Sequence, residues 1–156
     1  MKTTVVNDQD YELWVLLHQV SDAITKAREE ELRQYNISMI QAGVLFIVKN
    51  AKAPVTPAEI SRWLFREPHT VSGLLNRMQK QGLIKKTKDL DRKNLIRVTL
   101  TDKGEKAYQK SRQMKVVPKI LNRLSQKERD AFRSQLEKLR TKSLNEIGMK
   151  RKLPFP

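Results

Sequence analysis

The chain of 156 residues contains no cysteine. This absence excludes disulfides, thiolate nucleophiles, cysteine-ligated zinc and thiol-based oxidant sensing within the sequence. Long apolar runs are also missing, because no stretch approaches the roughly 20 residues that a membrane span needs. Near the N-terminus, Asp8 and Asp10 stand where a signal peptide would have its apolar segment. We therefore expect a soluble, cytoplasmic protein with no membrane partner.

Histidine is scarce as well. His18 and His69 fall on different predicted elements, and neither has a carboxylate or a second ligand at metal-binding spacing. We expect no catalytic site, metal or cofactor, and the chain is not predicted to be an enzyme. His18 lies in an apolar helical pattern, where packing is the simpler interpretation and contact with a small-molecule effector is the alternative.

Acidic residues are few beside the basic ones. Lys and Arg number 32 against 17 Asp and Glu, which gives a formal net charge of +15. Such a surplus favours a polyanionic partner, which can be DNA, RNA or an anionic membrane surface. A solubilising excess of lysine is the plainer alternative, so charge alone indicates a class of partner and no more.

Helical periodicity dominates both ends of the chain. In the region 8–36, Leu13, Leu17 and Val20 belong to one apolar stripe, and a second helix is predicted from an N-cap at Ser38 to about residue 50. Another helix is expected from Thr101, bent or divided at Pro118. The last helix, within the region 116–147, carries Phe132, Leu136 and Leu139 along one side. The tail, 148–156, is basic, and a frayed end is the simplest interpretation.

Residues 56–101 form a more specific pattern. Thr56-Pro57-Ala58-Glu59 is a capping box with proline at the first helical position, and a break at residues 66–68 precedes a helix from Pro68 to about residue 81. Two short helices around a tight turn predict a helix-turn-helix at about 57–81. After Gly82 the apolar period becomes two, which predicts strands at 83–87 and 95–100 around a polar turn. This hairpin, at about 84–100, has the position of a wing.

The predicted helix at 68–81 has two contrasting faces. Val71, Leu74, Leu75 and Met78 fall on one side and are expected to pack into the core. The opposite side presents hydroxyl, amide and basic groups, which can read base edges in the major groove of DNA. These candidate DNA-binding residues are His69, Thr70, Ser72, Gly73, Asn76, Arg77 and Lys80. An ordinary solvated face is the alternative, but such faces are usually richer in acidic residues.

The hairpin tip carries the second group of candidates. Arg92 and Lys93 can reach a minor groove, where narrow A·T-rich segments attract a guanidinium. Asp89 or Asp91 is expected to hydrogen-bond the Arg92 guanidinium and orient it. A simple charged turn would be the preferred interpretation if the preceding helix were absent.

These segments together resemble a known family. The run Gly82-Leu83-Ile84, then Asp91-Arg92-Lys93, then Val98-Thr99-Leu100-Thr101-Asp102-Lys103-Gly104 resembles the wing of MarR family regulators, and Thr56–Ile60 and Thr70–Leu75 resemble their helix-turn-helix. The resemblance implies one mainly α unit spanning 1–156, with a small β-wing and flanking dimerisation helices at 8–36 and 116–147. It also implies a homodimer that binds a pseudo-palindromic operator in double-stranded DNA and is nucleoid-associated when bound. Members of the family are commonly repressors, and many release DNA when a small-molecule effector binds.

The apolar stripes agree with a dimer, because the terminal helices carry more apolar surface than a monomer needs. The dimerisation residues are predicted to be Leu13, Leu17, Val20, Phe132, Leu136 and Leu139. A basic structural protein that binds DNA or RNA non-specifically remains an alternative, as does a protein-interaction module. Operator, regulated genes, effector, and the choice between repressor and activator stay open.

Overall fold

A computed structural model describes residues 8–92 and 94–149 of the chain. It contains seven helices and one two-stranded antiparallel sheet in these ranges. In chain order they are α1 (Asp8–Arg33), α2 (Met39–Asn50), α3 (Pro57–Leu64), α4 (Pro68–Lys80), β1 (Ile84–Lys88), β2 (Ile96–Leu100), α5 (Asp102–Arg112), α6 (Val116–Leu121) and α7 (Gln126–Glu146). The predicted fold class, mainly α with a small β-wing, is confirmed.

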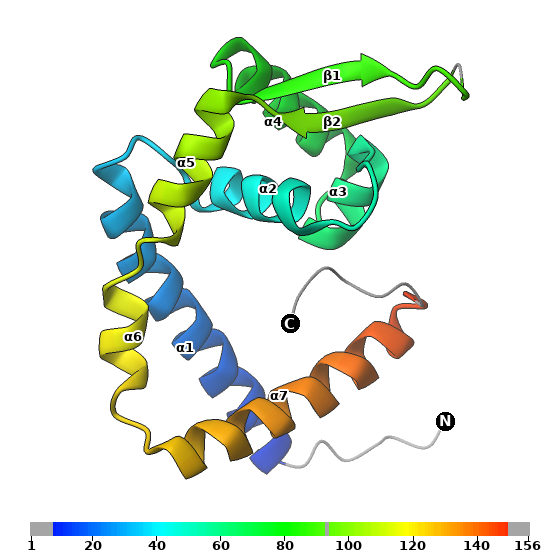
Figure 1. The fold of residues 1–156 in the computed structure, drawn as a ribbon. Coiled ribbons are helices and arrows are strands. Elements are labelled where there is room, and N and C mark those ends of the chain that lie inside the picture. Colours follow the sequence, from blue (N-terminus) through cyan, green and yellow to red (C-terminus); the bar gives the residue numbers. More distant parts are fainter. Residues whose placement is uncertain (1–7, 93, 150–156) are drawn as a thin grey trace.

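Two parts can be distinguished in Figure 1. Helices α2 to α5 and the hairpin lie together as a winged unit, whereas α1, α6 and α7 extend away from it as an arm. Near its C-terminal end α1 contacts α2 and α6. The chain therefore passes between arm and winged unit twice, at residues 34–38 and again at residues 113–115.

Side-chain caps start the helices where the sequence predicts them. The Ser38 hydroxyl accepts a hydrogen bond from the Gln41 N–H, and the Gln41 side chain accepts one from the Ser38 N–H. Thr56 and Glu59 form the same reciprocal pair at α3. Each box satisfies two N–H groups that lack partners within the helix, which fixes where the helix begins.

The winged unit has a closed apolar core. Val44, Ile60, Leu75 and Met78 are fully buried, so α2, α3 and α4 meet at one centre. Val98 of β2 is buried with them, and its N–H donates to the carbonyl of Val55 at 2.8 Å. This bridge anchors the base of the hairpin to the connector before α3, so the wing is fixed to the helices at its root.

Gly104 fits the start of α5 beneath the loop that leads into the hairpin. A Cβ at this position would lie 1.9 Å from the Leu83 carbonyl oxygen. The Thr101 hydroxyl accepts a hydrogen bond from the Gly104 N–H at 3.0 Å and donates one to the Gly82 carbonyl at 2.5 Å. The glycine of the wing motif is thus needed because α5 approaches the backbone too closely for any side chain.

The prediction for Pro118 is wrong in position. Helix α5 already ends at Arg112, and Pro118 lies in the first turn of the separate helix α6. Proline is tolerated there because the first N–H groups of a helix have no intrahelical partner. The break falls instead at residues 113–115, whose neighbours are held by side chains of α1.

Candidate nucleic-acid interface

Helix α4 separates its side chains as its sequence indicates. Val71, Leu74, Leu75 and Met78 are buried, which confirms the predicted core face. The opposite face is open to solvent in the single chain. His69, Thr70, Ser72, Asn76, Arg77 and Lys80 are exposed there, and Gly73 is half-buried among them. The winged unit therefore presents one row of donors and acceptors along a fixed helix.

The first turn of α4 is left open at its N-terminus. The N-cap residue Glu67 makes no side-chain cap hydrogen bond, and the turn contains no acidic residue. Free N–H groups and the positive end of the helix dipole are suited to a phosphate oxygen. With His69 and Thr70 exposed beside them, this end of the helix can bind a DNA backbone while the rest of the row faces the bases.

Gly73 is not required by packing within the chain. A Cβ at Gly73 would meet only the Arg77 guanidinium, 3.7 Å away, which is ordinary contact. Glycine in a helix interior costs about 1 kcal/mol relative to alanine. A residue that lowers helix stability without an internal steric reason is consistent with the close approach of another molecule at this face.

Lys86 is part of this surface and was not among the residues singled out from the sequence. Its Nζ donates a hydrogen bond to Oδ1 of Asn76, which connects strand β1 to the exposed face of α4. The contact leaves the Asn76 amide N–H groups free to donate. The alternating pattern of β1 indicates that Lys86 points to one side of the hairpin, but it does not indicate which helix residue it meets.

Asp89 organises the turn of the wing. One carboxylate oxygen accepts hydrogen bonds from the N–H groups of Asp91 at 2.8 Å and Arg92 at 3.2 Å. The other oxygen binds the guanidinium of Arg97. The expectation that Asp89 or Asp91 orients the Arg92 guanidinium is not what the structure shows for Asp89, which holds the backbone of Arg92 and leaves its side chain exposed. Lys93 lies outside the described residues.

These contacts keep Asp89 ionised. The N–H of Asp91 is the main cause of a lowered pKa, followed by the Arg97 side chain, and both outweigh the opposing effect of burial. The negative charge is thereby neutralised within the hairpin rather than presented at its tip. Arg92 can extend from this turn without a facing carboxylate of Asp89.

The six apolar residues assigned to dimerisation remain uncovered in the single chain. Their exposed fractions lie between 37% and 58% for Leu13, Leu17, Val20, Phe132, Leu136 and Leu139. They lie on α1 and α7, the two long helices of the arm (Figure 1). His18, expected to pack, meets the exposed Trp14 ring edge-on at 4.7 Å. Exposed apolar surface of this extent is typical of surfaces through which proteins associate.

A pocket of about 1010 Å³ opens where the winged unit meets the arm. Its aromatic walls come from Phe46, Trp63 and Tyr108. Its charged lining residues are Arg28, Lys52, Arg112 and the acidic Glu59. The Tyr108 hydroxyl is fixed by the Asn50 amide at 3.1 Å, and the Arg112 guanidinium lies 5.9 Å from the Tyr108 ring centre. An aromatic ligand that carries negative charge would find both stacking surfaces and counter-charges here.

Other classes of site have no counterpart in the described ranges. No group of three or more His, Cys, Asp or Glu residues is placed to hold a metal ion among residues 8–92 and 94–149. Across the same ranges, no helix has the length and apolar character needed to cross a membrane.

Two short helices followed by a hairpin, with an exposed polar face on the second helix, define a winged helix-turn-helix protein. A model of the MarR family matches residues 35–103. The uncharacterized HTH-type transcriptional regulator YwoH of Bacillus subtilis (strain 168) is 25% identical over 122 residues, covering 75% of this chain and 88% of that protein. Residues 35–103 of the chain thus match the MarR family, and the chain is similar to an HTH-type transcriptional regulator over most of its length.

Solved structures agree over the whole fold. The organohalide sensing RdhR-CbdbA1625 transcriptional regulator, in its 2,4-dichlorophenol bound form, is 29% identical with a TM-score of 0.83, covering 100% of this chain and 95% of that chain. A mutant of MarR from E. coli complexed with operator DNA has the same fold, with a TM-score of 0.77 at 21% identity over 87% of this chain and 99% of that one. Members of the family are regulators rather than enzymes.

Proposed function

We propose that this chain binds double-stranded DNA sequence-specifically as a homodimer and represses transcription from the bound site. The observation that carries the proposal is the exposed row on α4, from His69 to Lys80, held on a buried apolar face. Hydroxyl, amide and guanidinium groups along one helix are the groups that read a major groove. The same fold in the E. coli MarR mutant is complexed with operator DNA.

The wing supplies the second contact in this proposal. Arg92 extends from a turn that Asp89 holds through two backbone N–H groups. A guanidinium on a narrow hairpin can enter a minor groove that a helix cannot. With helix and wing in adjacent grooves, one winged unit would cover one half-site.

A second copy of the chain is the proposed partner of the arm. Exposed apolar residues on α1 and α7 lie far from the α4 face, so two copies can pair through their arms while both winged units stay free. A two-fold dimer then requires a pseudo-palindrome whose half-site centres lie about one turn, roughly 10 bp, apart. Occupying such a site near a promoter excludes other proteins from it, which is the physical basis of repression.

We further propose that an aromatic effector with a phenolate or carboxylate group binds in the pocket between arm and winged unit. The walls provide Phe46 and Trp63 for a ring, and Lys52 and Arg112 for a negative charge. The RdhR-CbdbA1625 regulator, similar over the full length of this chain, is described as organohalide sensing and was solved with 2,4-dichlorophenol. A ligand at this position would contact both parts of the molecule and thereby lower the affinity for DNA.

The DNA proposal is tested by selecting bound sequences from a random duplex pool at moderate salt, with sedimentation to give the mass of the protein. We expect a pseudo-palindrome and a dimer. Enrichment of no sequence, with steep salt dependence and equal binding of RNA, would instead favour the non-specific structural protein.

The effector proposal can be read optically, because the chain has two tryptophans and only Trp63 lines the pocket. In Trp14→Phe, fluorescence reports on Trp63 alone. We expect 2,4-dichlorophenol to quench it saturably and to release a bound operator duplex, with cyclohexanol as the non-aromatic control. No change in fluorescence or in DNA affinity up to the solubility limit would contradict this effector class.

A further inference from the structure

Two charged side chains of α1 are buried where the arm joins the winged unit. The side chains of Arg28 and Glu31 are only 6% and 11% exposed, and they pair with each other at 2.7 Å. Charged side chains are rarely buried unless they are paired. Two residues further along the helix, Glu30 and Arg33 form an ion pair of the same spacing that is open to solvent, at 56% and 72% exposed. The buried pair therefore differs from the exposed pair in its surroundings, which supply further hydrogen-bond partners.

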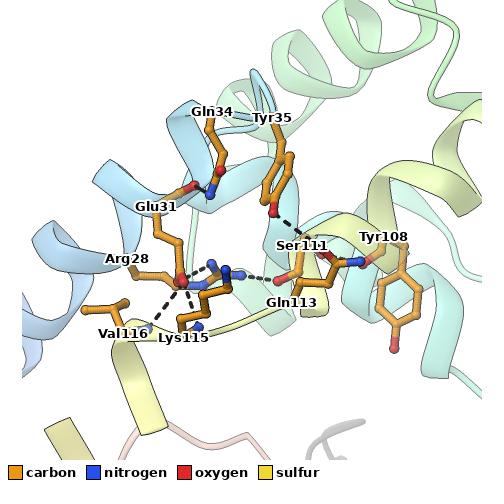
Figure 2. Close-up of polar contacts among 9 residues, drawn as sticks. All are labelled: Arg28, Glu31, Gln34, Tyr35, Tyr108, Ser111, Gln113, Lys115 and Val116. Atoms are coloured by element: carbon orange, nitrogen blue, oxygen red, sulfur yellow. Dashed lines mark hydrogen bonds and ion pairs between the residues drawn. The ribbon is translucent and has the colours of Figure 1, made fainter. Parts of the chain in front are cut away.

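The buried pair binds the backbone of the second crossing between the two parts (Figure 2). The other Glu31 oxygen accepts hydrogen bonds from the N–H groups of Lys115 at 2.6 Å and Val116 at 3.3 Å. On the opposite side of the break, the Arg28 guanidinium donates to the carbonyl of Ser111. One carboxylate thus caps α6, and one guanidinium caps the end of α5.

The first crossing is tied to the same place. The Gln34 amide donates to the Glu31 carbonyl at 2.9 Å, and Tyr35 donates its hydroxyl to the Gln113 side chain at 3.5 Å. Residues 34–38 and 113–115 are the only two links between arm and winged unit along the described chain. Leu32 at the end of α1 is buried in the core of the winged unit. Because neither link is helical, the orientation of the winged unit on the arm depends on this packing and on the side-chain contacts at the links.

We propose that Arg28 and Glu31 are positioning residues that fix the orientation of the winged unit on the arm, and that they thereby set the half-site spacing the dimer accepts. This inference rests on the proposed DNA-binding dimer. The hydrogen bonds from this pair to Ser111, Lys115 and Val116 all end on backbone atoms, so the pair restrains the path of the chain rather than a mobile side chain. We call Arg28, Glu31 and the link at 113–115 the joint. Removing either charged residue leaves the other charge buried without its partner, so each depends strongly on the other.

The consequence for DNA is a geometric one. A dimer with rigid joints holds its two α4 helices at one separation, and an operator with a changed spacer must then bend or twist to bind. A dimer with loose joints can adjust the protein instead. The joint thus contributes to specificity through spacing, without touching a base.

The test compares Glu31→Ala with the matched control Glu30→Ala, which removes the same charge from the exposed pair. Glu31→Gln is a second variant that keeps an oxygen for the Lys115 and Val116 N–H groups. Binding is measured for the selected operator and for versions with two base pairs added or removed between half-sites. Hydrogen exchange of residues 113–117 is measured without DNA, together with the melting temperature and the dimer mass.

We expect the wild type and Glu30→Ala to bind operators with altered spacers about tenfold or more weakly than the selected operator. In Glu31→Ala this loss should fall to about threefold, because a loosened joint populates more orientations of the winged unit. Exchange at 113–117 should rise in Glu31→Ala, and less in Glu31→Gln, while the dimer persists. A folded, dimeric Glu31→Ala with an unchanged spacing profile and unchanged exchange would overturn the inference. If the wild type itself shows no preferred operator, the proposed function fails instead, and exchange at 113–117 alone still decides whether the joint exists.

Discussion

Arg97 donates a hydrogen bond from Nε to Oδ2 of Asp89 at 2.6 Å, and its Nη2 forms an ion pair with the same oxygen at 2.6 Å. The other Asp89 oxygen is taken by backbone N–H groups of the turn. The pair joins the two sides of the hairpin just below its tip. As a result the Asp89 carboxylate is neutralised within the hairpin, and the exposed Arg92 side chain is not paired with it.

We expect Arg92→Ala to weaken operator binding while the dimer remains intact. The lost contact is electrostatic, so the defect should shrink as salt is raised and both proteins lose phosphate contacts. Gel-shift titration at several salt concentrations measures the affinity, and sedimentation checks the mass. Arg33→Ala, an exposed arginine on the arm, is the charge-matched control. Equal affinity of Arg92→Ala and the wild type for the operator would show that Arg92 of the wing does not contribute to DNA binding.

Arg77→Ala and Asn76→Ala should narrow the difference in binding free energy between the operator and random DNA by about 1–3 kcal/mol, the usual effect of losing a base contact. Competition binding with both duplexes gives this difference directly. A variant that loses equal affinity for both DNAs contacts the backbone instead. Lys86→Met should change the base preference opposite Asn76, because Lys86 occupies Oδ1 of that amide.

For Gly73→Ala we expect folding stability and DNA affinity to change in opposite directions. The added Cβ has space within the chain, and helix propensity should raise the free energy of unfolding by up to about 1 kcal/mol. The same methyl group would hold α4 away from the groove floor. Urea unfolding and operator titration measure the two effects. Unchanged affinity would mean that no close approach occurs at this residue.

Gly104→Ala should destabilise the winged unit by about 1–3 kcal/mol or more, since the new Cβ overlaps a backbone oxygen that cannot rotate away. Gly73→Ala is the internal comparison, because both changes add one methyl group to a helical glycine. Thermal unfolding at fixed protein concentration separates them. A Gly104→Ala protein as stable as Gly73→Ala would show that α5 can shift from the Leu83 carbonyl at little cost.

Glu31 predicts a pH dependence of stability. Burial acts to raise the pKa of its carboxyl, but the N–H groups of Lys115 and Val116 and the Arg28 guanidinium outweigh it, so the pKa is lowered. A lowered folded pKa gives stability that is complete above the usual value of 4.5 and is lost as pH falls through the folded value. The stability difference between wild type and Glu31→Gln should therefore be largest near neutral pH and decrease in acid. Glu30→Gln should show a much smaller dependence in the same urea series.

The helix starts and the wing were predictable because their causes are local. The capping boxes at Ser38 and Thr56 each involve residues three positions apart, and the change of period after Gly82 is visible within residues 83–100. The two faces of α4 follow from its own spacing of apolar residues. Interactions contained within one turn or one strand can be read without the rest of the fold.

The joint was not predictable for the opposite reason. Glu31 meets the N–H of Lys115 across 84 positions in the sequence, and it forms part of a run of ordinary charged residues. Its burial depends on where α6 lies, and the break before α6 was expected at Pro118 rather than at 113–115. The contact of Lys86 with Asn76 likewise depends on how the hairpin lies against α4. Packing between distant elements decides these side chains.

Helix α7 contains 21 residues and buries none of them within the chain. An isolated helix gains little from propensity alone, so its persistence in water depends on the surface that covers it. If a second copy supplies that surface, the arm becomes ordered only when two chains associate, and its stability depends on protein concentration. Dilution would then unfold the arm while the winged core stays closed, leaving the unfolded arm open to proteases. A cell that stops making this protein would thereby hasten the removal of what remains.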